Sequence, residues 1–116
     1  MKEVPVFTLW MEITSWILDR TEDFPKKFRY SMSNRIVNIT LKILEMIIEA
    51  LYINKKTLIL KKINIEIEKL RIFLRLCRER KMLSENQYEC IQEKLYSAGK
   101  MIGGWFKHSN RNEQSL

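Results

Sequence analysis

The fold is decided by one stretch of the sequence, residues 60–77, which reads LKKINIEIEKLRIFLRLC. An α-helix repeats about every 3.6 residues, so apolar side chains spaced three and four apart share one of its faces. Such an alternation over this whole stretch predicts a long amphipathic helix that packs one face against a hydrophobic core. The apolar positions are Leu60, Ile63, Ile67, Leu70, Leu74 and Cys77.

The same stretch, extended to residues 55–81, also carries the positive charge of the chain. It holds ten basic residues against three acids, and the excess of seven equals the formal net charge of +7 for all 116 residues. A helix with one apolar face and a strongly basic remainder can bury the first and offer the second to a polyanion. This pattern points toward nucleic acid. The basic residues are Lys55, Lys56, Lys61, Lys62, Lys69, Arg71, Arg75, Arg78, Arg80 and Lys81.

Further segments repeat the helical spacing on either side of this stretch. The first runs over residues 6–21 and is expected to end before Pro25, because the residue preceding a proline is pushed out of the α region. The second is predicted over residues 26–53, and the third is predicted to end near Lys81. Ser84 is expected to cap the fourth helix, with Gln87 three residues later completing a capping box.

The chain is therefore predicted to be all-α, an antiparallel up-down four-helix bundle. Residues 1–108 are assigned to the bundle domain, and residues 109–116 are expected to form a polar, disordered tail. Only three glycines and two prolines are present, which leaves little material for the turns of an all-β fold.

A second apolar stripe lies on the predicted third helix, outside the first. It consists of Ile65, Ile72 and Leu76, with Phe73 between the two stripes. Two interpretations remain open at this point: a wide surface that faces the core, or an interface between copies of the chain. A slender bundle has much surface for its volume, so self-association is expected.

The basic side chains form rows that suit a phosphate backbone. Arg71, Arg75 and Arg78 follow one another at i, i+4 and i+7, and Lys62 and Lys69 form a second row. The alternative is a solvated face whose cations pair with acids on the same helix, such as Glu68 with Arg71 or Arg75. The head of the second helix adds further bases, which an antiparallel bundle would bring near the end of the third helix. They are Lys26, Lys27, Arg29, Arg35 and Lys42.

Several classes of function find no support in the sequence. No apolar run approaches the roughly 20 residues that span a bilayer, and no signal peptide is recognisable, so a cytoplasmic location is expected. One histidine, His108, and two cysteines without close spacing do not suggest a metal site. No pattern for a catalytic nucleophile, a metal or a cofactor appears, and the chain is predicted not to be an enzyme.

Short segments along nearly the whole chain resemble a known family. They read WILDRT at residues 16–21, FPK at 24–26, SNRI at 33–36, LRIFLRL at 70–76 and GGW at 103–105. In this order they resemble the accessory variability determinant (Avd) proteins of diversity-generating retroelements. The wider group also includes four-helix proteins encoded by intervening sequences in bacterial ribosomal RNA genes, which remain the alternative, with a structural or RNA-binding role.

The resemblance implies a partner for a retroelement reverse transcriptase. Avd proteins are homopentamers of four-helix bundles that bind the enzyme and nucleic acid and support cDNA synthesis from template-repeat RNA during mutagenic retrohoming. The resemblance would make Arg71, Arg75 and Arg78 the main contacts to RNA, with DNA or a hybrid as further ligands, and would place Arg35 and Lys26 beside them. A structural helical oligomer and a small helical nuclease are the competing hypotheses.

Overall fold

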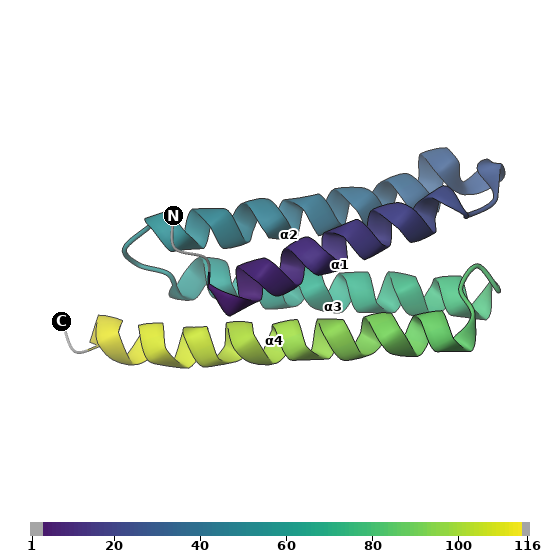
Figure 1. The fold of residues 1–116 in the computed structure, drawn as a ribbon. Coiled ribbons are helices and arrows are strands. Elements are labelled where there is room, and N and C mark those ends of the chain that lie inside the picture. The colour runs from purple at the N-terminus through teal and green to yellow at the C-terminus, as the bar shows by residue number, and fades with distance from the viewer. Residues whose placement is uncertain (1–3, 115–116) are drawn as a thin grey trace.

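Four long helices account for most of the chain in the computed structural model, which describes residues 4–114 (Figure 1). They are α1 (Pro5–Glu22), α2 (Asn34–Tyr52), α3 (Thr57–Glu79) and α4 (Glu85–Gln114). A 3₁₀ turn, η1 (Lys26–Phe28), and a π-helical turn, η2 (Arg29–Ser33), join α1 to α2. No strand occurs in this part of the chain.

Each helix packs against the next, and α4 returns to pack against α1, so the helices form a closed ring around one core. Successive helices run in opposite directions, in a molecule of 51 × 22 × 22 Å (Figure 1). The connections α1–α2 and α3–α4 lie at one end, which we call the turn end (Figure 1). The predicted all-α, antiparallel four-helix bundle is confirmed.

The core consists of the apolar faces that the spacing predicts. All six seam residues of α3 are buried, as are Val6, Trp10, Ile13 and Ile17 of α1. On α2 the buried side chains Ile36, Ile43 and Ala50 lie seven residues apart, as do Thr40 and Ile47, whereas Met46 is only partly buried.

A buried hydrogen bond joins α1 to α2 within this core. The indole Nε1 of Trp10, which is fully buried, donates to the backbone carbonyl of Thr40 over 2.9 Å. The Thr40 carbonyl can accept this bond within a helix because a carbonyl oxygen has two lone pairs, and the Thr40 hydroxyl donates separately to Ile36 O over 2.8 Å. This bond fixes the register of α1 against α2. The positions of the basic residues of α2 depend on that register.

The predicted second helix, residues 26–53, is interrupted in the structure. Pro25 precedes the 3₁₀ turn, the π-helical turn follows, and regular α2 begins only at Asn34. A π turn holds an extra residue, so it shifts the face on which each following side chain lies. Here Ser33 turns inward and is buried, whereas Tyr30 is 88% exposed. The prediction of one continuous helix from Lys26 was therefore wrong.

The C-terminal segment also differs from the prediction of a disordered tail beginning at Ser109. Helix α4 continues to Gln114 because this segment is anchored: Ser109 is buried, and Thr57 Oγ1 donates to Glu113 Oε1 over 3.3 Å. Residues 115–116 lie outside the described part. At the other end of α4 the predicted capping box is confirmed, with Gln87 N donating to Ser84 Oγ over 3.1 Å and Ser84 N donating to Gln87 Oε1 over 3.0 Å.

The second apolar stripe of α3 points away from the core. Ile65 is 57% exposed, Ile72 56% and Leu76 39%, and Leu58 extends the stripe toward the start of the helix. The core-facing interpretation of these residues is therefore wrong for the single bundle. None of the helices over residues 4–114 is both long and apolar enough to cross a membrane.

Candidate nucleic-acid interface

The arginine row of α3 lies on the side of that helix that faces α4, and each of its members contacts an acid. Arg71 lies 3.5 Å from Glu68 and donates through Nε to Gln92 of α4 over 3.1 Å. Arg75 Nε lies 3.4 Å from Glu79. Arg78 Nε lies 3.9 Å from Glu85, and its guanidinium carbon is 4.4 Å from the centre of the Tyr88 ring. The alternative interpretation from the sequence, a solvated face whose arginines pair with nearby acids, thus describes the contacts of this row.

Exposed ion pairs of this kind hold their partners weakly. Arg75 keeps 66% of its side chain exposed, and the side chains of Glu79 and Glu85 are 51% and 72% exposed. Such pairs contribute about 0 to 1 kcal/mol, so a phosphate can replace the carboxylate. The arginine row can bind a polyanion only if each arginine first releases the carboxylate that it contacts.

A second cluster occupies the groove between α2 and α3, which we call the α2/α3 groove. Lys42 of α2 and Lys69 of α3 both lie 3.2 Å from Glu66 Oε1, and the Glu66 side chain is only 10% exposed. Arg35, Asn38 and Ile39 complete the lining of this pocket of about 210 Å³. The structure therefore brings Arg35 and Lys69 together around one buried acid, and it adds Lys42, which the sequence assigned to a basic stretch but not to the site.

Glu66 determines where the two lysine side chains of the groove lie. Burial raises the pKa of its carboxyl, but the hydrogen bonds and positive charges of Lys42 and Lys69 outweigh this effect and lower the pKa from its ordinary value of 4.5. The carboxylate is therefore charged at neutral pH and holds one ammonium group from each helix. With Arg35 included, the groove keeps an excess of two positive charges.

Replacing Glu66 by Gln is expected to lower the free energy of unfolding at pH 7 by about 1 kcal/mol, because two charged hydrogen bonds are weakened while the lysines stay largely solvated. A carboxyl whose pKa is lowered in the folded state stabilises the fold at pH values above its ordinary pKa. This contribution to the free energy of unfolding is lost as the pH falls. The difference between Glu66→Gln and wild type should therefore shrink below about pH 4.5. Urea unfolding at pH 7 and pH 3 measures it.

Glu68→Gln is the matched control for this measurement, since the Glu68 side chain is 62% exposed and Arg71 is its one ion-pair partner among residues 4–114. It should change the free energy of unfolding by less than about 0.5 kcal/mol at either pH. An equal loss in both variants at pH 7 would contradict the organising role of Glu66.

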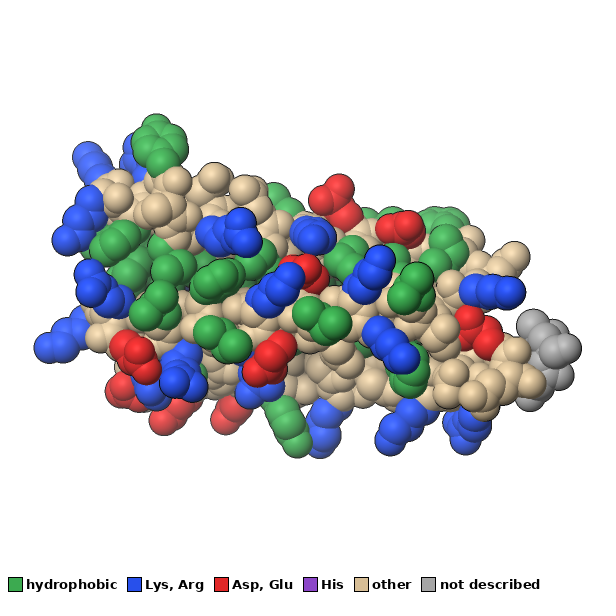
Figure 2. Space-filling model, turned by 180° about the vertical axis from the view of Figure 1, so that it is seen from behind, with side chains coloured by type: hydrophobic (Ala, Val, Ile, Leu, Met, Phe, Trp, Pro, Cys, Tyr) green, Lys and Arg blue, Asp and Glu red, His purple; other side chains and the backbone are tan. Residues whose placement is uncertain are grey.

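The turn end of the bundle carries a third group of basic residues. Lys27 lines a pocket of about 330 Å³ together with Arg80 and Lys81, so the head of η1 does lie beside the end of α3. Glu79 is the acid at this pocket. In Figure 2, Lys and Arg side chains gather at this end and are elsewhere interspersed with hydrophobic ones.

The seven residues predicted as nucleic-acid contacts thus fall into two groups. Arg71, Arg75, Arg78 and Lys69 contact acids, whereas Lys26, Arg35 and Lys62 make no ion pair with any residue between positions 4 and 114. Lys62 is exposed on α3, one heptad before Lys69. The residues that the site prediction missed are Lys42 and Glu66. The i, i+3 spacing of Glu66 and Lys69 was visible in the sequence, but the contact of Glu66 with Lys42 depends on the register of two helices.

The acidic residues of α1 do not neutralise these clusters in the contacts that the structure shows. Glu12 accepts a hydrogen bond of 2.6 Å from Lys94 of α4, which raises the pKa of that lysine. Within residues 4–114, no acid of α1 forms an ion pair with a base of α2 or α3.

The groups considered for chemistry are held in structural contacts. Burial raises the pKa of the Cys77 thiol to about 11, so this side chain is an uncharged part of the core. His108 Nε2 lies 3.1 Å from Asn112 Nδ2, one turn further along α4. Among residues 4–114, no cluster of His, Cys, Asp and Glu could hold a metal ion.

Fold and surface together define the class of this protein as a small four-helix bundle with basic clusters in one interhelical groove and at one end. A family model described as bAvd-like matches residues 9–109, which covers most of the chain and all four helices. The chain therefore belongs to the bAvd-like family, in agreement with the resemblance to Avd proteins. A comparison with curated proteins finds no match.

Proposed function

We propose that this protein is the nucleic-acid-binding accessory subunit of a diversity-generating retroelement and that it supports the reverse transcriptase without chemistry of its own. The observation that carries the proposal is the match to the bAvd-like family over residues 9–109. The basic groove and the basic turn end support the nucleic-acid part of it, because a phosphate backbone requires positive charge without base-specific contacts.

The cations without acid partners are the ones that we assign to the first contact with nucleic acid. Lys26, Arg35 and Lys62 make no ion pair over residues 4–114, so a phosphate does not have to displace a carboxylate from them. The paired row of Arg71, Arg75 and Arg78 contributes less to affinity. The template-repeat RNA is the proposed ligand, and a cytoplasmic site of action is part of the proposal. The homopentamer is what the Avd resemblance implies.

Two triple variants with equal charge change test this assignment. Replacing Lys26, Arg35 and Lys62 by Gln should weaken binding to single-stranded RNA more than replacing Arg71, Arg75 and Arg78 by Gln. The unpaired triple should also flatten the dependence of log K on log salt concentration by about 2 units, since three phosphate contacts are lost at about 0.7 each. Fluorescence anisotropy with a labelled RNA, at several salt concentrations, measures both quantities.

Circular dichroism is the control for folding in both variants, and the exposed side chains of the unpaired triple should each change stability by less than about 0.5 kcal/mol. A larger loss in the paired triple would assign the site to the arginine row of α3. Failure of the wild-type protein to bind RNA at low salt would contradict the nucleic-acid function itself.

A further inference from the structure

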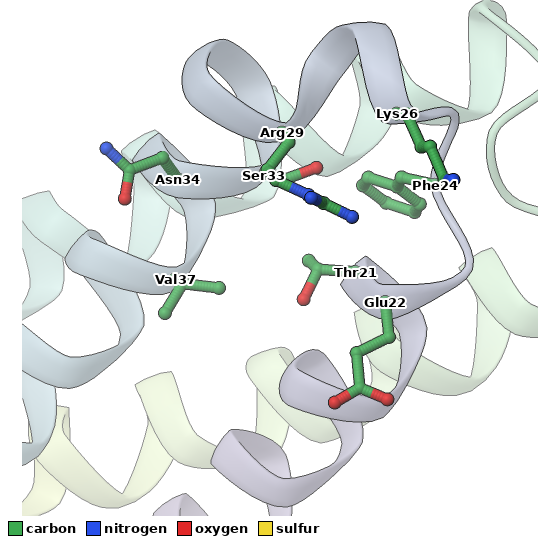
Figure 3. A pocket seen from close by; sticks show the side chains of 8 residues that line it. All are labelled: Thr21, Glu22, Phe24, Lys26, Arg29, Ser33, Asn34 and Val37. Carbon is green, nitrogen blue, oxygen red and sulfur yellow. The ribbon is translucent and has the colours of Figure 1, made fainter.

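A pocket of about 440 Å³ lies where α1 ends and α2 begins (Figure 3). Pockets of this size are in the range that holds a small molecule. Helix α1 contributes its last turn, and the irregular turns η1 and η2 contribute the basic wall. The lining residues are Thr21, Glu22, Phe24, Lys26, Arg29, Ser33, Asn34 and Val37.

Positive charge dominates this pocket. Lys26 and Arg29 line it, and neither makes an ion pair with a residue in the described part of the chain. Glu22 is the single acid in the lining, and Figure 3 shows its carboxylate pointing away from the guanidinium of Arg29. In the same view the Arg29 guanidinium extends into the space between Thr21, Ser33 and Phe24.

Ser33 supplies a second and independent indication of a ligand. The residue is 8% exposed, and its Oγ is buried without any hydrogen-bond partner among residues 4–114. A buried hydroxyl without a partner costs free energy, and native proteins rarely keep one without a reason. Ser33 ends the π-helical turn, and such turns occur frequently at functional sites.

The chemistry of the lining specifies the ligand. A guanidinium, an ammonium and a hydroxyl donor suit the oxygens of a phosphate group, and the exposed Arg29 side chain can shift to admit one of them to Ser33. Phe24 and Val37 form an apolar wall for the rest of the ligand. Thr21 cannot donate as well, because its hydroxyl already donates to Ile17 over 2.8 Å.

We propose that this pocket binds the phosphate group of a nucleotide through Lys26, Arg29 and Ser33. The nucleotide is either free in solution or part of a nucleic-acid strand, and the second source rests on the function proposed above. The pocket differs from the α2/α3 groove in that it encloses one phosphate instead of following a backbone.

Isothermal titration calorimetry with adenosine monophosphate and with adenosine tests the proposal on the full-length chain. The monophosphate should bind, and adenosine, which lacks the phosphate, should bind at least about tenfold more weakly. Arg29→Gln should weaken binding of the monophosphate about tenfold or more, and Ser33→Ala several-fold. Ser33→Ala should not lower the melting temperature, because it removes a hydroxyl that has no partner in the free protein.

Lys107→Gln is the control of equal charge change, since Lys107 is exposed on α4 and does not line this pocket. It should bind the monophosphate as the wild type does. Absence of binding to the wild type at millimolar monophosphate, or equal affinities of Arg29→Gln and Lys107→Gln, would overturn the proposal.

Single-stranded RNA distinguishes the two sources of the phosphate. If Arg29→Gln loses more RNA affinity than Lys107→Gln, the pocket serves a strand, and if both bind RNA equally, it serves a free nucleotide. Binding of the monophosphate by a wild-type protein that binds no RNA would sustain the pocket and refute the nucleic-acid function. The reverse result would refute the pocket alone.

Discussion

Wild-type protein in light scattering is expected to show a mass several times the 14.1 kDa of one chain, and Ile65→Glu combined with Ile72→Glu is expected to reduce it to that of a single chain. Both isoleucines are more than half exposed on α3, and Leu58 and Leu76 continue the same stripe. An exposed apolar stripe of this length is typical of an interaction surface, and two carboxylates would have to be desolvated for the surface to close.

A second double variant asks which surface meets the stripe, because the subunits of a ring contact each other through two different faces. Met11 and Leu18 of α1 are 47% and 42% exposed and lie one heptad apart, as Ile65 and Ile72 do. If Met11→Glu with Leu18→Glu also yields single chains, α1 is the complementary face. Unchanged helicity by circular dichroism is required of both variants. A wild-type mass of 14.1 kDa would remove the assembly from the proposed function.

Omitting this protein from a reaction that contains the cognate reverse transcriptase and template-repeat RNA is expected to abolish or strongly reduce cDNA synthesis. A protein that binds both enzyme and template raises the effective concentration of one near the other by orders of magnitude, without any catalytic group. The triple variant Lys26→Gln, Arg35→Gln, Lys62→Gln should restore synthesis only in proportion to the RNA affinity that it retains. Primer extension with purified components measures the product.

The control for this reaction is His108→Ala, because His108 is the only histidine and the residue that a nuclease mechanism would most readily use. This variant should support synthesis as the wild type does. RNA cleavage by the purified protein that His108→Ala abolishes would establish an enzyme and contradict the proposal. Full synthesis without the protein would remove the reverse transcriptase as its partner.

The sequence predicted those parts of the fold that local rules govern. The α3 seam, the end of α1 before Pro25 and the Ser84–Gln87 capping box depend on spacing and on neighbours within one turn. The π-helical turn at Arg29–Ser33 is not visible in the hydrophobic period. The continuation of α4 past Ser109 was missed because its anchor, Thr57, lies on another helix.

The contacts of the candidate site were predictable from the sequence only where both residues lie within one helix turn. Glu68 with Arg71 and Arg75 with Glu79 are contacts at i, i+3 and i+4, and a sequence can indicate them. Glu85 approaches Arg78 across the α3–α4 connection, and Lys42 meets Glu66 across two helices, so both require the folded register. The cluster in the α2/α3 groove therefore forms only when α2 packs against α3. In the sequence, each of its members looks like an ordinary charged residue of a helix surface.

In the proposed function, the acids beside Arg71, Arg75 and Arg78 would compete with nucleic acid for these arginines. A phosphate that bound one of these arginines would displace a carboxylate, and the freed carboxylate would attract a counterion, so the net release of counterions would be smaller than at an unpaired cation. The arginine row would thereby discriminate by geometry, since only a polyanion that matches its spacing could displace several carboxylates together. The acids would suppress weak, indiscriminate attachment to cellular RNA while leaving a correctly shaped template able to compete.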